Sequence, residues 1–312
     1  MNHSEIDSAS RRLASHYGPF LRRTPLWKLP GAALGVDCAE VWLKLEHLQV
    51  GGSFKARGML NRLLANDIPP AGVIVASGGN AGIATAAAAG ALGVRCEVFV
   101  PAAAPEAKRA RLRDLGAEVV VGGDGYAQAF EACMARQQVS GALLTHAYDQ
   151  PEVLAGAGTL AKEIEDEGGL PDSVLVSVGG GGLIGGIAAW FEQRARVVAL
   201  EPVLCPTLVE ARQEGHPVDV QVSGVAADAL GAKRIGALSW EVTQRHVRDA
   251  LLLEDDAIRS AQRWLWRELK LAVEPAAALG LAALRTGVYR PAAGERVCLI
   301  VCGANVDPAT LA

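Results

Sequence analysis

The sequence predicts an α/β protein made of two open, mostly parallel sheets with helices packed on them. Short apolar stretches typical of buried strands alternate with longer stretches of helical character, which is the pattern of βαβ units. The alternation falls into two series, separated by an irregular segment near residue 147. The length of 312 residues is enough for two domains of ordinary size.

The chain opens with a polar stretch over 4–17 that is expected to be helical. Partial alternation over 41–46 (VWLKLE) then predicts a strand. Gly51-Gly52 makes a turn, and Ser53 is a plausible N-cap for a helix over 54–64.

From Pro69-Pro70 onward the alternation is regular. The strands expected in the first series cover 73–76, 96–100, 118–121 and 143–145, and its helices cover 81–92, 105–115 and 126–138. The strands expected in the second series cover 173–178, 196–200 and 296–301, and its helices cover 152–167, 183–194, 255–270 and 275–286. Pro69-Pro70 and the irregular HAYDQP stretch after Thr145 place the domain boundaries near residues 68 and 147.

Composition excludes several classes of protein. Apolar residues make up 50% and charged residues 21%, so the chain is not of the disordered type. Thirty basic against 34 acidic residues give a net charge of -4, which argues against nucleic acid as a partner. The six cysteines contain no CxxC pair and the histidines no HxH or HExxH spacing, which argues against zinc sites and a disulfide scaffold. No signal-peptide core and no apolar run of about 18–20 residues is present, so we expect a cytoplasmic protein that does not contact membranes.

Three loops between a strand and a helix carry candidate chemistry, because open α/β sheets bind ligands beyond the carboxyl ends of their strands. The first is VGGGGLIGG over 178–186, where Gly179 to Gly182 present bare amides at a helix N-terminus and suit a phosphate. The same stretch fits GxGxxG as Gly180, Gly182 and Gly185, with Glu201 as a ribose-binding acid. A phosphate cofactor, a dinucleotide and a tight packing turn therefore all remain open for this loop.

The second loop, over 77–82 (SGGNAG), presents free amides and an Asn side chain at the positive end of a helix, which suits a carboxylate. The third loop, over 53–58 (SFKARG), places Lys55 at the start of an apolar helix. Such a lysine is usually solvated, but burial would lower its pKa and allow it to form a Schiff base. A lysine, a phosphate cup and a carboxylate loop together are the set that a pyridoxal phosphate enzyme needs.

The motifs SFKARG, SGGNAG, VGGGGLIGG and VCGAN occur in this order, and with them the sequence resembles the fold-type II pyridoxal phosphate enzymes, the tryptophan synthase β-like family. Serine/threonine dehydratases (ammonia-lyases) and serine racemases are the members it resembles most. The resemblance covers roughly residues 15–310. It implies a large domain of residues 1–68 and 147–312, a small domain of residues 69–146, and a cofactor in the cleft between them.

The resemblance also implies roles for single residues. Lys55 matches the lysine that forms the Schiff base with pyridoxal 5'-phosphate, and Phe54 matches the residue packed near the cofactor ring. Asn80 matches the residue bonded to the cofactor's 3′ oxygen, and Cys302 matches the Ser or Cys beside the pyridine nitrogen. The phosphate cup corresponds to Gly179, Gly180, Gly181 and Gly182. The loop that binds the substrate carboxylate corresponds to Ser77, Gly78, Gly79, Asn80 and Ala81.

A structural cation is a further expectation from the resemblance. Glu201, with Cys205 and Thr207 beside it, falls where relatives hold such an ion. Oxygen ligands suit a hard cation, and position 207 holds a threonine where an aspartate would favour magnesium. We therefore expect a monovalent ion, potassium or sodium. The alternative is that Glu201 pairs with a nearby arginine.

The sequence departs from the family pattern at four places. Gly78 stands where similar racemases have a serine that acts as a second acid/base. Ala157 replaces the glutamine of GQGT, Gly51 replaces a threonine or serine, and AVEPAAALG lacks the usual EPxGA pattern. These changes leave the cofactor residues intact and leave the substrate side chain open.

Together these features predict a β-eliminating ammonia-lyase, a homodimer, that acts on a small β-hydroxy amino acid, L-serine or L-threonine by preference, and releases a 2-oxo acid and ammonia. A serine racemase or β-replacement synthase is the alternative within the family. Outside the family, a nicotinamide-dependent dehydrogenase would use the Gly180/Gly182/Gly185 loop, and a non-catalytic binding protein is also possible. The basic run of Lys108, Arg109, Arg111 and Arg113 is expected to form a solvated helix face.

Overall fold

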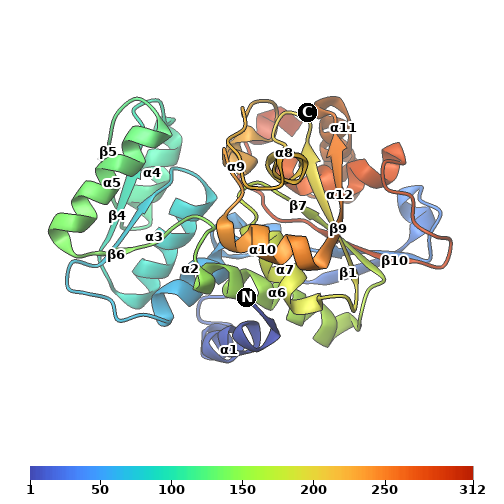
Figure 1. Ribbon diagram of the computed structural model, residues 1–312, viewed down its shortest axis with the longest axis horizontal. Coiled ribbons are helices and arrows are strands. Elements are labelled where there is room, and N and C mark those ends of the chain that lie inside the picture. The colour runs from blue at the N-terminus through green and yellow to red at the C-terminus, as the bar shows by residue number, and fades with distance from the viewer. Residues whose placement is uncertain (312) are drawn as a thin grey trace.

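Two separate sheets organise the chain, as the two series of strands predict. The computed structural model describes residues 1–311 and has a six-stranded sheet of order β1-β2-β10-β7-β8-β9 and a four-stranded sheet of order β5-β4-β3-β6 (Figure 1). All neighbouring strands are parallel except β1 and β2, which are antiparallel. The predicted fold class, α/β with two mostly parallel sheets, is therefore confirmed.

The four-stranded sheet lies at one end of the molecule, with its helices, and every element of it falls within the predicted small domain, residues 69–146. Its strands are β3 (Val73–Ala76), β4 (Cys96–Val100), β5 (Glu118–Val121) and β6 (Leu143–Leu144), and its helices are α3 (Asn80–Leu92), α4 (Glu106–Asp114) and α5 (Tyr126–Ser140). Helix α3 consists almost entirely of small residues, most of them buried, and this lets it pack closely against the neighbouring helix α2 (Lys55–Leu64).

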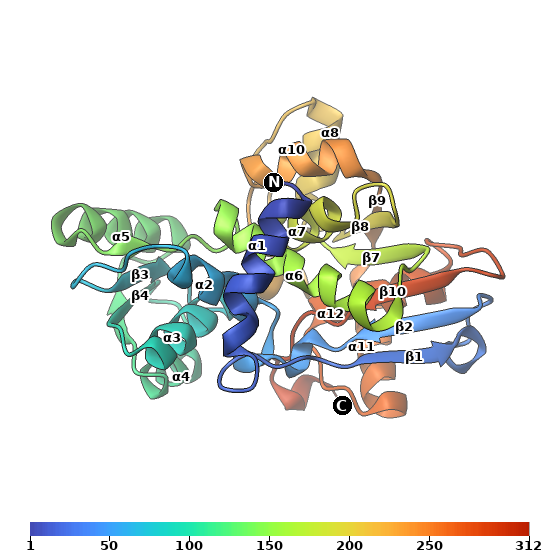
Figure 2. The ribbon, with the colours of Figure 1, turned by 90° about the horizontal axis from the view of Figure 1, so that it is seen from below.

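The six-stranded sheet combines both ends of the chain. Figure 2 shows β1, β2, β10 and β7 next to one another. Its strands are β1 (Leu26–Pro30), β2 (Glu40–Lys44), β7 (Ser173–Ser177), β8 (Arg196–Pro202), β9 (Val247–Leu253) and β10 (Arg296–Ile300). The helices around it are α1 (His3–Leu13), α6 (Pro151–Gly168), α7 (Gly182–Phe191), α8 (Thr207–Glu214), α9 (Ala227–Leu230), α10 (Ala237–His246), α11 (Asp255–Leu269) and α12 (Pro275–Thr286).

Five elements were not predicted from the sequence. Strand β1 lies in a stretch expected to be a loop, and β9, α8, α9 and α10 lie between 201 and 254, where no element was expected. Strands β1 and β9 are the two edges of the six-stranded sheet and are only partly buried, so their apolar patterns are weak. The expectation for Ser53 is wrong: Phe54 is the N-cap residue of α2, and the Ser53 hydroxyl is buried without a hydrogen-bond partner.

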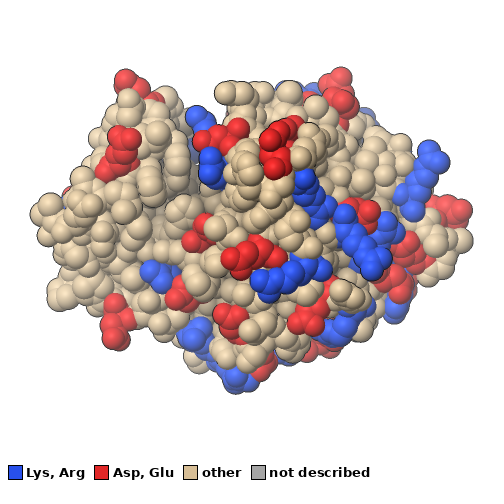
Figure 3. Space-filling model, viewed as in Figure 1, with Lys and Arg blue, Asp and Glu red and all other residues tan. Residues whose placement is uncertain are grey.

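The surface has two lobes that correspond to the two sheets, with a hollow between them (Figure 3). Because strands β3 and β7 both end near this hollow, the loops that follow them meet there. No helix among residues 1–311 is long and apolar enough to cross a membrane.

A buried ion network joins the elements beneath the hollow. Arg57 on α2 donates to both carboxylate oxygens of Glu46 at 2.8 Å and also to Glu163 on α6. Lys44 at the end of β2 lies 2.8 Å from the same Glu163 carboxylate. Burial, the largest single influence, raises the pKa of Glu46, but the charges of Arg57 and Lys44 and the hydrogen bonds from Arg57 and Thr24 together lower it by more. The net pKa of Glu46 therefore lies below its ordinary value. The network is therefore charged, and one buried oxygen in it, Glu163 Oε1, has no hydrogen-bond partner.

Replacing Arg57 should destabilise the fold strongly. Arg57→Met leaves two buried carboxylates without their partner, and breaking a buried pair in this way costs about 3–5 kcal/mol. Urea unfolding of the two proteins measures the difference. The control is Arg11→Met, which breaks an exposed pair with Asp7 and should change the free energy of unfolding by less than about 1 kcal/mol. Equal effects of the two substitutions would contradict the assigned network.

Candidate active site

The residues predicted to bind a cofactor lie around one cavity of about 50 Å³ between the lobes. Lys55 and Phe54 come from the start of α2, Asn80 from the start of α3, and Cys302 from the segment after β10. The other walls are the glycine loop Gly179–Gly182, Tyr148, Ser177, Leu183, Ala229, Leu230, Glu274 and Ala276. The sequence analysis assigned no role to Tyr148, Ser177 or Glu274, which reach the cavity from distant parts of the chain.

The glycine loop connects β7 to α7 and needs glycine for steric reasons. Gly181 is the N-cap of α7 and has a φ of +87°, which L side chains rarely adopt. A Cβ on Gly180 would clash with the Tyr148 ring, and one on Gly181 would lie 2.6 Å from Ser239. The bare backbone at the positive end of α7 is therefore a cradle for an anion. Ser239 was not singled out from the sequence, yet its buried hydroxyl at this cradle has no hydrogen-bond partner.

The Lys55 amine is enclosed at the hinge between the lobes. Its Nζ donates to the Ala147 carbonyl at 2.5 Å and lies 5.2 Å from the centre of the Phe54 ring. Burial lowers the pKa of Lys55 to about 8, although the nearby Cys302 and Glu274 oppose this shift. The neutral fraction of this amine near physiological pH is thus far larger than that of an ordinary lysine, which suits a nucleophile or a base.

Asn80 is held from two sides. Its amide nitrogen donates to both oxygens of the buried Glu274 carboxylate at 3.0 and 3.1 Å, and its oxygen accepts from Asn305 at 2.7 Å. Burial raises the pKa of Glu274 to about 7, and the hydrogen bond from Asn80 acts in the opposite direction. The orientation of Asn80 is therefore fixed by Glu274 and by the segment after β10. The sequence signal that could have pointed to Glu274 as a site residue is its position directly before Pro275, at the start of a predicted helix.

The predicted carboxylate loop, Ser77 to Ala81, runs from the end of β3 into α3, as expected. Gly79 is the N-cap residue of α3, and its amide donates to the Ser77 hydroxyl at 3.3 Å. A Cβ on Gly79 would lie 3.9 Å from the Asp228 carbonyl, so the loop faces helix α9 of the other lobe. Of the five residues, Asn80 lines the cavity itself.

Cys302 lies on the cavity wall next to the start of α2, and its carbonyl accepts from the Phe54 amide at 3.1 Å. Burial raises the pKa of the Cys302 thiol well above its ordinary value. It is therefore a neutral thiol that offers only a weak donor and acceptor to anything bound beside it.

Glu201, Cys205 and Thr207 lie together behind the glycine loop. The Thr207 hydroxyl contacts both the Gly179 carbonyl at 2.6 Å and the Glu201 carboxylate at 2.9 Å. The amides of Leu208 and Val209, at the start of α8, also donate to Glu201. Burial raises the pKa of Glu201 to about 7. These hydrogen bonds satisfy the Glu201 carboxylate and connect α8 to the glycine loop. Within residues 1–311 Glu201 forms no ion pair with an arginine, which was the alternative expectation.

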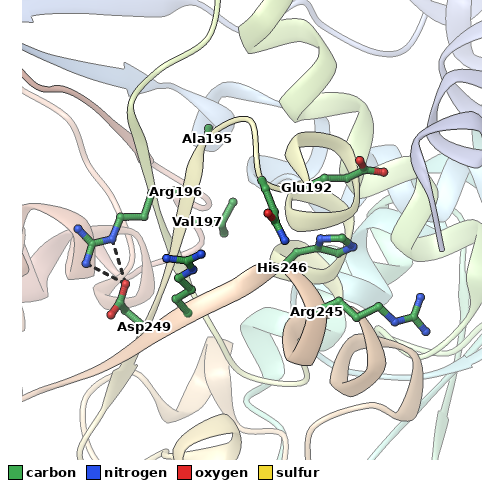
Figure 4. Close-up of a pocket in the computed structure, with 9 residues that line it drawn as sticks. Glu192, Ala195, Arg196, Val197, Arg245, His246 and Asp249 are labelled. Carbon is green, nitrogen blue, oxygen red and sulfur yellow. Dashed lines mark hydrogen bonds and ion pairs between the residues drawn. The ribbon is translucent and has the colours of Figure 1, made fainter.

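Within residues 1–311 no group of three or more His, Cys, Asp or Glu side chains could hold a metal ion. A hollow of about 610 Å³ lies elsewhere, around the amino ends of β8 and β9. It is lined by arginines and His246, and Arg196 pairs there with Asp249 (Figure 4). It lies at the opposite end of the strands from the predicted loops, so we assign it no part in the site.

This fold and this site, with a partly neutral lysine facing an anion cradle across a cleft, define a pyridoxal phosphate enzyme. Residues 18–303 match the family described as "Pyridoxal-phosphate dependent enzyme". The chain belongs to this family, as the resemblance implied. Membership also argues against the dehydrogenase alternative, and Glu201, its ribose ligand, is already bonded to α8.

Relatives of known name are similar over most of the chain. An L-threonine ammonia-lyase of Thermotoga maritima is 32% identical over 87% of this chain and 69% of its own. A phenylserine dehydratase of Ralstonia pickettii is 35% identical over 94% of this chain and 89% of its own. Among solved structures, maize serine racemase (TM-score 0.91, 29% identity) covers 99% of this chain and 95% of its own. The threonine deaminase of T.th. (TM-score 0.89, 32% identity) covers 98% of this chain and 99% of its own.

The lowered pKa of Lys55 can be measured without turnover. In cofactor-free protein, the rate at which an amine-reactive reagent modifies Lys55 should rise with a midpoint near pH 8, below the value of about 10.4 for an ordinary lysine. Glu274→Gln should move the midpoint lower still, because the Glu274 charge stabilises the ammonium. Mass spectrometry of the Lys55 peptide gives both values. A midpoint above pH 10 in the native sequence would show that the amine is not buried as described.

Proposed function

We propose that this protein is a β-eliminating ammonia-lyase that converts a small β-hydroxy amino acid, L-serine or L-threonine by preference, to a 2-oxo acid and ammonia. The observation that carries the proposal is the position of Lys55 across one cavity from the glycine loop, in a chain of the pyridoxal phosphate family. The names of its relatives, threonine ammonia-lyase and phenylserine dehydratase, support elimination.

The residues around the cavity fit pyridoxal 5'-phosphate. The glycine cradle, with the unpartnered Ser239 hydroxyl behind it, suits the phosphate, and Lys55 is the amine that would hold the aldehyde carbon. Asn80, Phe54 and Cys302 would surround the ring. When bound, the cofactor supplies an electron sink that stabilises negative charge on the substrate Cα.

The chain's own residues then have distinct tasks. The amides at the start of α3 and the Ser77 hydroxyl would bind the substrate carboxylate and so orient the Cα–H bond. The Lys55 amine, with its pKa near 8, would take the Cα proton as a general base. The β-hydroxyl would leave with a proton as water, driven by the negative charge left at Cα. The released enamine would then react with water to give the 2-oxo acid and ammonia. Cys302, as a neutral thiol, adds no negative charge at the site.

Removing Lys55 should abolish both turnover and covalent attachment. Lys55→Ala is expected to lose 2-oxo acid release from every amino acid in a panel of L-serine, L-threonine and 3-phenylserine. It should also fail to retain pyridoxal phosphate after borohydride reduction, as followed by mass spectrometry. Reduction of the cofactor onto a different lysine in this variant would overturn the assignment of Lys55.

Bulkier β-hydroxy amino acids belong in the panel for a structural reason. Tyr148 on the cavity wall stacks edge-on with His146 (4.7 Å between ring centres), and Phe130 packs edge-on against His146 (6.2 Å). An aromatic wall of this kind would favour an aryl β-substituent, and the phenylserine dehydratase is among the relatives. Gly78 adds little space for such a substituent, because a Cβ at this position would already contact Val100 and Ala104 at 3.4 and 3.9 Å.

We expect elimination without racemisation, because racemisation needs a proton donor on each face of Cα and Gly78 has no side chain to donate one. With L-serine, D-serine should form at least about 100-fold more slowly than pyruvate, the usual cost of a missing acid/base group. Chiral chromatography beside a pyruvate assay measures both. Gly78→Ser fits the structure at ordinary contact distance and should gain racemase activity. Comparable rates of D-serine and pyruvate in the native sequence would refute this expectation.

The monovalent cation also remains part of the proposal. Its ligands would be the oxygens of Glu201 and Thr207, which hydrogen-bond to each other behind the glycine loop, and carbonyls at or near Cys205. One of these, the Ser223 carbonyl, accepts from the Cys205 thiol. Activity should be higher in potassium or sodium than in a buffer whose cations are bulky and organic, because such cations do not fit among these oxygens. Equal activity in all three buffers, with no effect of a chelator, would rule out the proposed cation site. The homodimer and the cytoplasmic location are further parts of the proposal.

A further inference from the structure

One ion pair joins the two lobes at the edge of the cleft. Figure 3 shows basic and acidic side chains next to one another where the lobes approach, near the position of α9 in Figure 1. The pair is Lys108 on α4 and Asp228 on α9: Lys108 Nζ donates to the Asp228 carboxylate. Within residues 1–311 no other ion pair connects the segment 69–146 with the rest of the chain.

Lys108 differs in this from the other basic residues of its helix. Arg109 donates to the carbonyls of Ala102 and Ala104, and Arg113 pairs with Glu106 on the same helix. The expected solvated face thus holds for Arg111 and Arg113, which are exposed. It fails for Lys108 and Arg109, whose side chains are 32% and 21% exposed, and of these two Lys108 crosses the cleft. Holding a long, flexible side chain such as that of Lys108 in one geometry costs conformational entropy. An ion pair between the two lobes should therefore stabilise something that offsets this cost.

The reason lies in what Asp228 adjoins. Its carbonyl lies 3.9 Å from the Cβ position of Gly79, in the predicted carboxylate loop. Two residues later, Leu230 lies against the glycine loop, with its Cα 3.0 Å from the Cβ position of Gly179, and Ala229 and Leu230 line the cavity. The four-residue helix α9 is thus a spacer between the two loops of the site.

Helix α9 has few internal bonds to fix its place. Its amides at Ala229 and Leu230 both donate to the Ala226 carbonyl, and a single turn of helix is marginal without outside support. Lys108 supplies that support from the lobe that carries the carboxylate loop. A shift of α4 relative to α9 would therefore change the spacing of the two loops.

We propose that Lys108 and Asp228 are positioning residues whose ion pair clamps the two lobes together and sets the carboxylate loop, 77–81, against the glycine loop, 179–182, for the reaction. The inference rests on the proposed function for what the loops bind. Neither residue touches the reacting atoms, so the clamp acts through α9 and the loops it separates.

The test compares Lys108→Met, Asp228→Asn and the charge-swapped double variant Lys108→Asp/Asp228→Lys. Each single substitution should raise KM for the best amino acid of the panel about tenfold with a smaller change in kcat, because the substrate carboxylate is held less well. The double variant should reverse most of this increase in KM. Arg113→Met, which breaks an ion pair within the same helix α4, is the matched control and should leave KM unchanged.

A second measurement does not depend on activity. Hydrogen exchange of the holoenzyme, followed by mass spectrometry, should speed up in peptides that cover 77–81 and 227–230 in both single variants. It should return toward the native rate in the double variant and stay native in Arg113→Met. Native exchange rates in the single variants, or a double variant no better than the singles in KM, would overturn the clamp. If the native enzyme turned over no amino acid of the panel, the proposed function would fail, and the exchange rates alone would still decide the clamp.

Discussion

A single buried guanidinium, that of Arg57, ties together the segments on which the site depends. It lies two residues after Lys55 on α2 and bonds to Glu46 after β2, to Glu163 on α6 and to Tyr17 after α1. Arginine suits this place because its planar fork can satisfy two carboxylates at once. The start of α2, and with it the Lys55 amine, therefore cannot move without breaking charged hydrogen bonds in a medium of low polarity.

Above this network, the site consists largely of backbone. The glycine loop and the carboxylate loop both follow a parallel strand and both open a helix, so each presents amides at a positive helix end. The lysine lies between them at the hinge. In the proposed function the two loops are the anion sites for the substrate carboxylate and the cofactor phosphate, and Lys55 is the base between them. The side chains that matter, Asn80, Glu274 and Ser239, orient or support these loops.

The two lobes make separate contributions to the site, and contacts across the cleft must hold them in register. Asn80 bonds across the cleft to Glu274 and Asn305, and Lys108 bonds across it to Asp228. Two polar contacts of this kind, one inside the cavity and one at its rim, fix the carboxylate loop relative to the glycine loop.

The fold class, the three loops between strands and helices, and the place of Lys55 at the start of a helix could all be predicted from local sequence patterns. The expected strands at 73–76 and 173–178 are strongly apolar, and a glycine-rich turn follows each of them. Local patterns of this kind indicate a buried strand and its turn without knowledge of the fold. Other features could not be predicted: Tyr148 and Glu274 line the same cavity, Ser239 lies against the glycine loop, Glu201 bonds to α8, and Lys108 crosses to Asp228. Each of these depends on where segments far apart in the chain come to lie, which no local pattern encodes. The edge strands β1 and β9 were missed for the same reason, because their pairing with the sheet, and not their own apolar pattern, makes them strands.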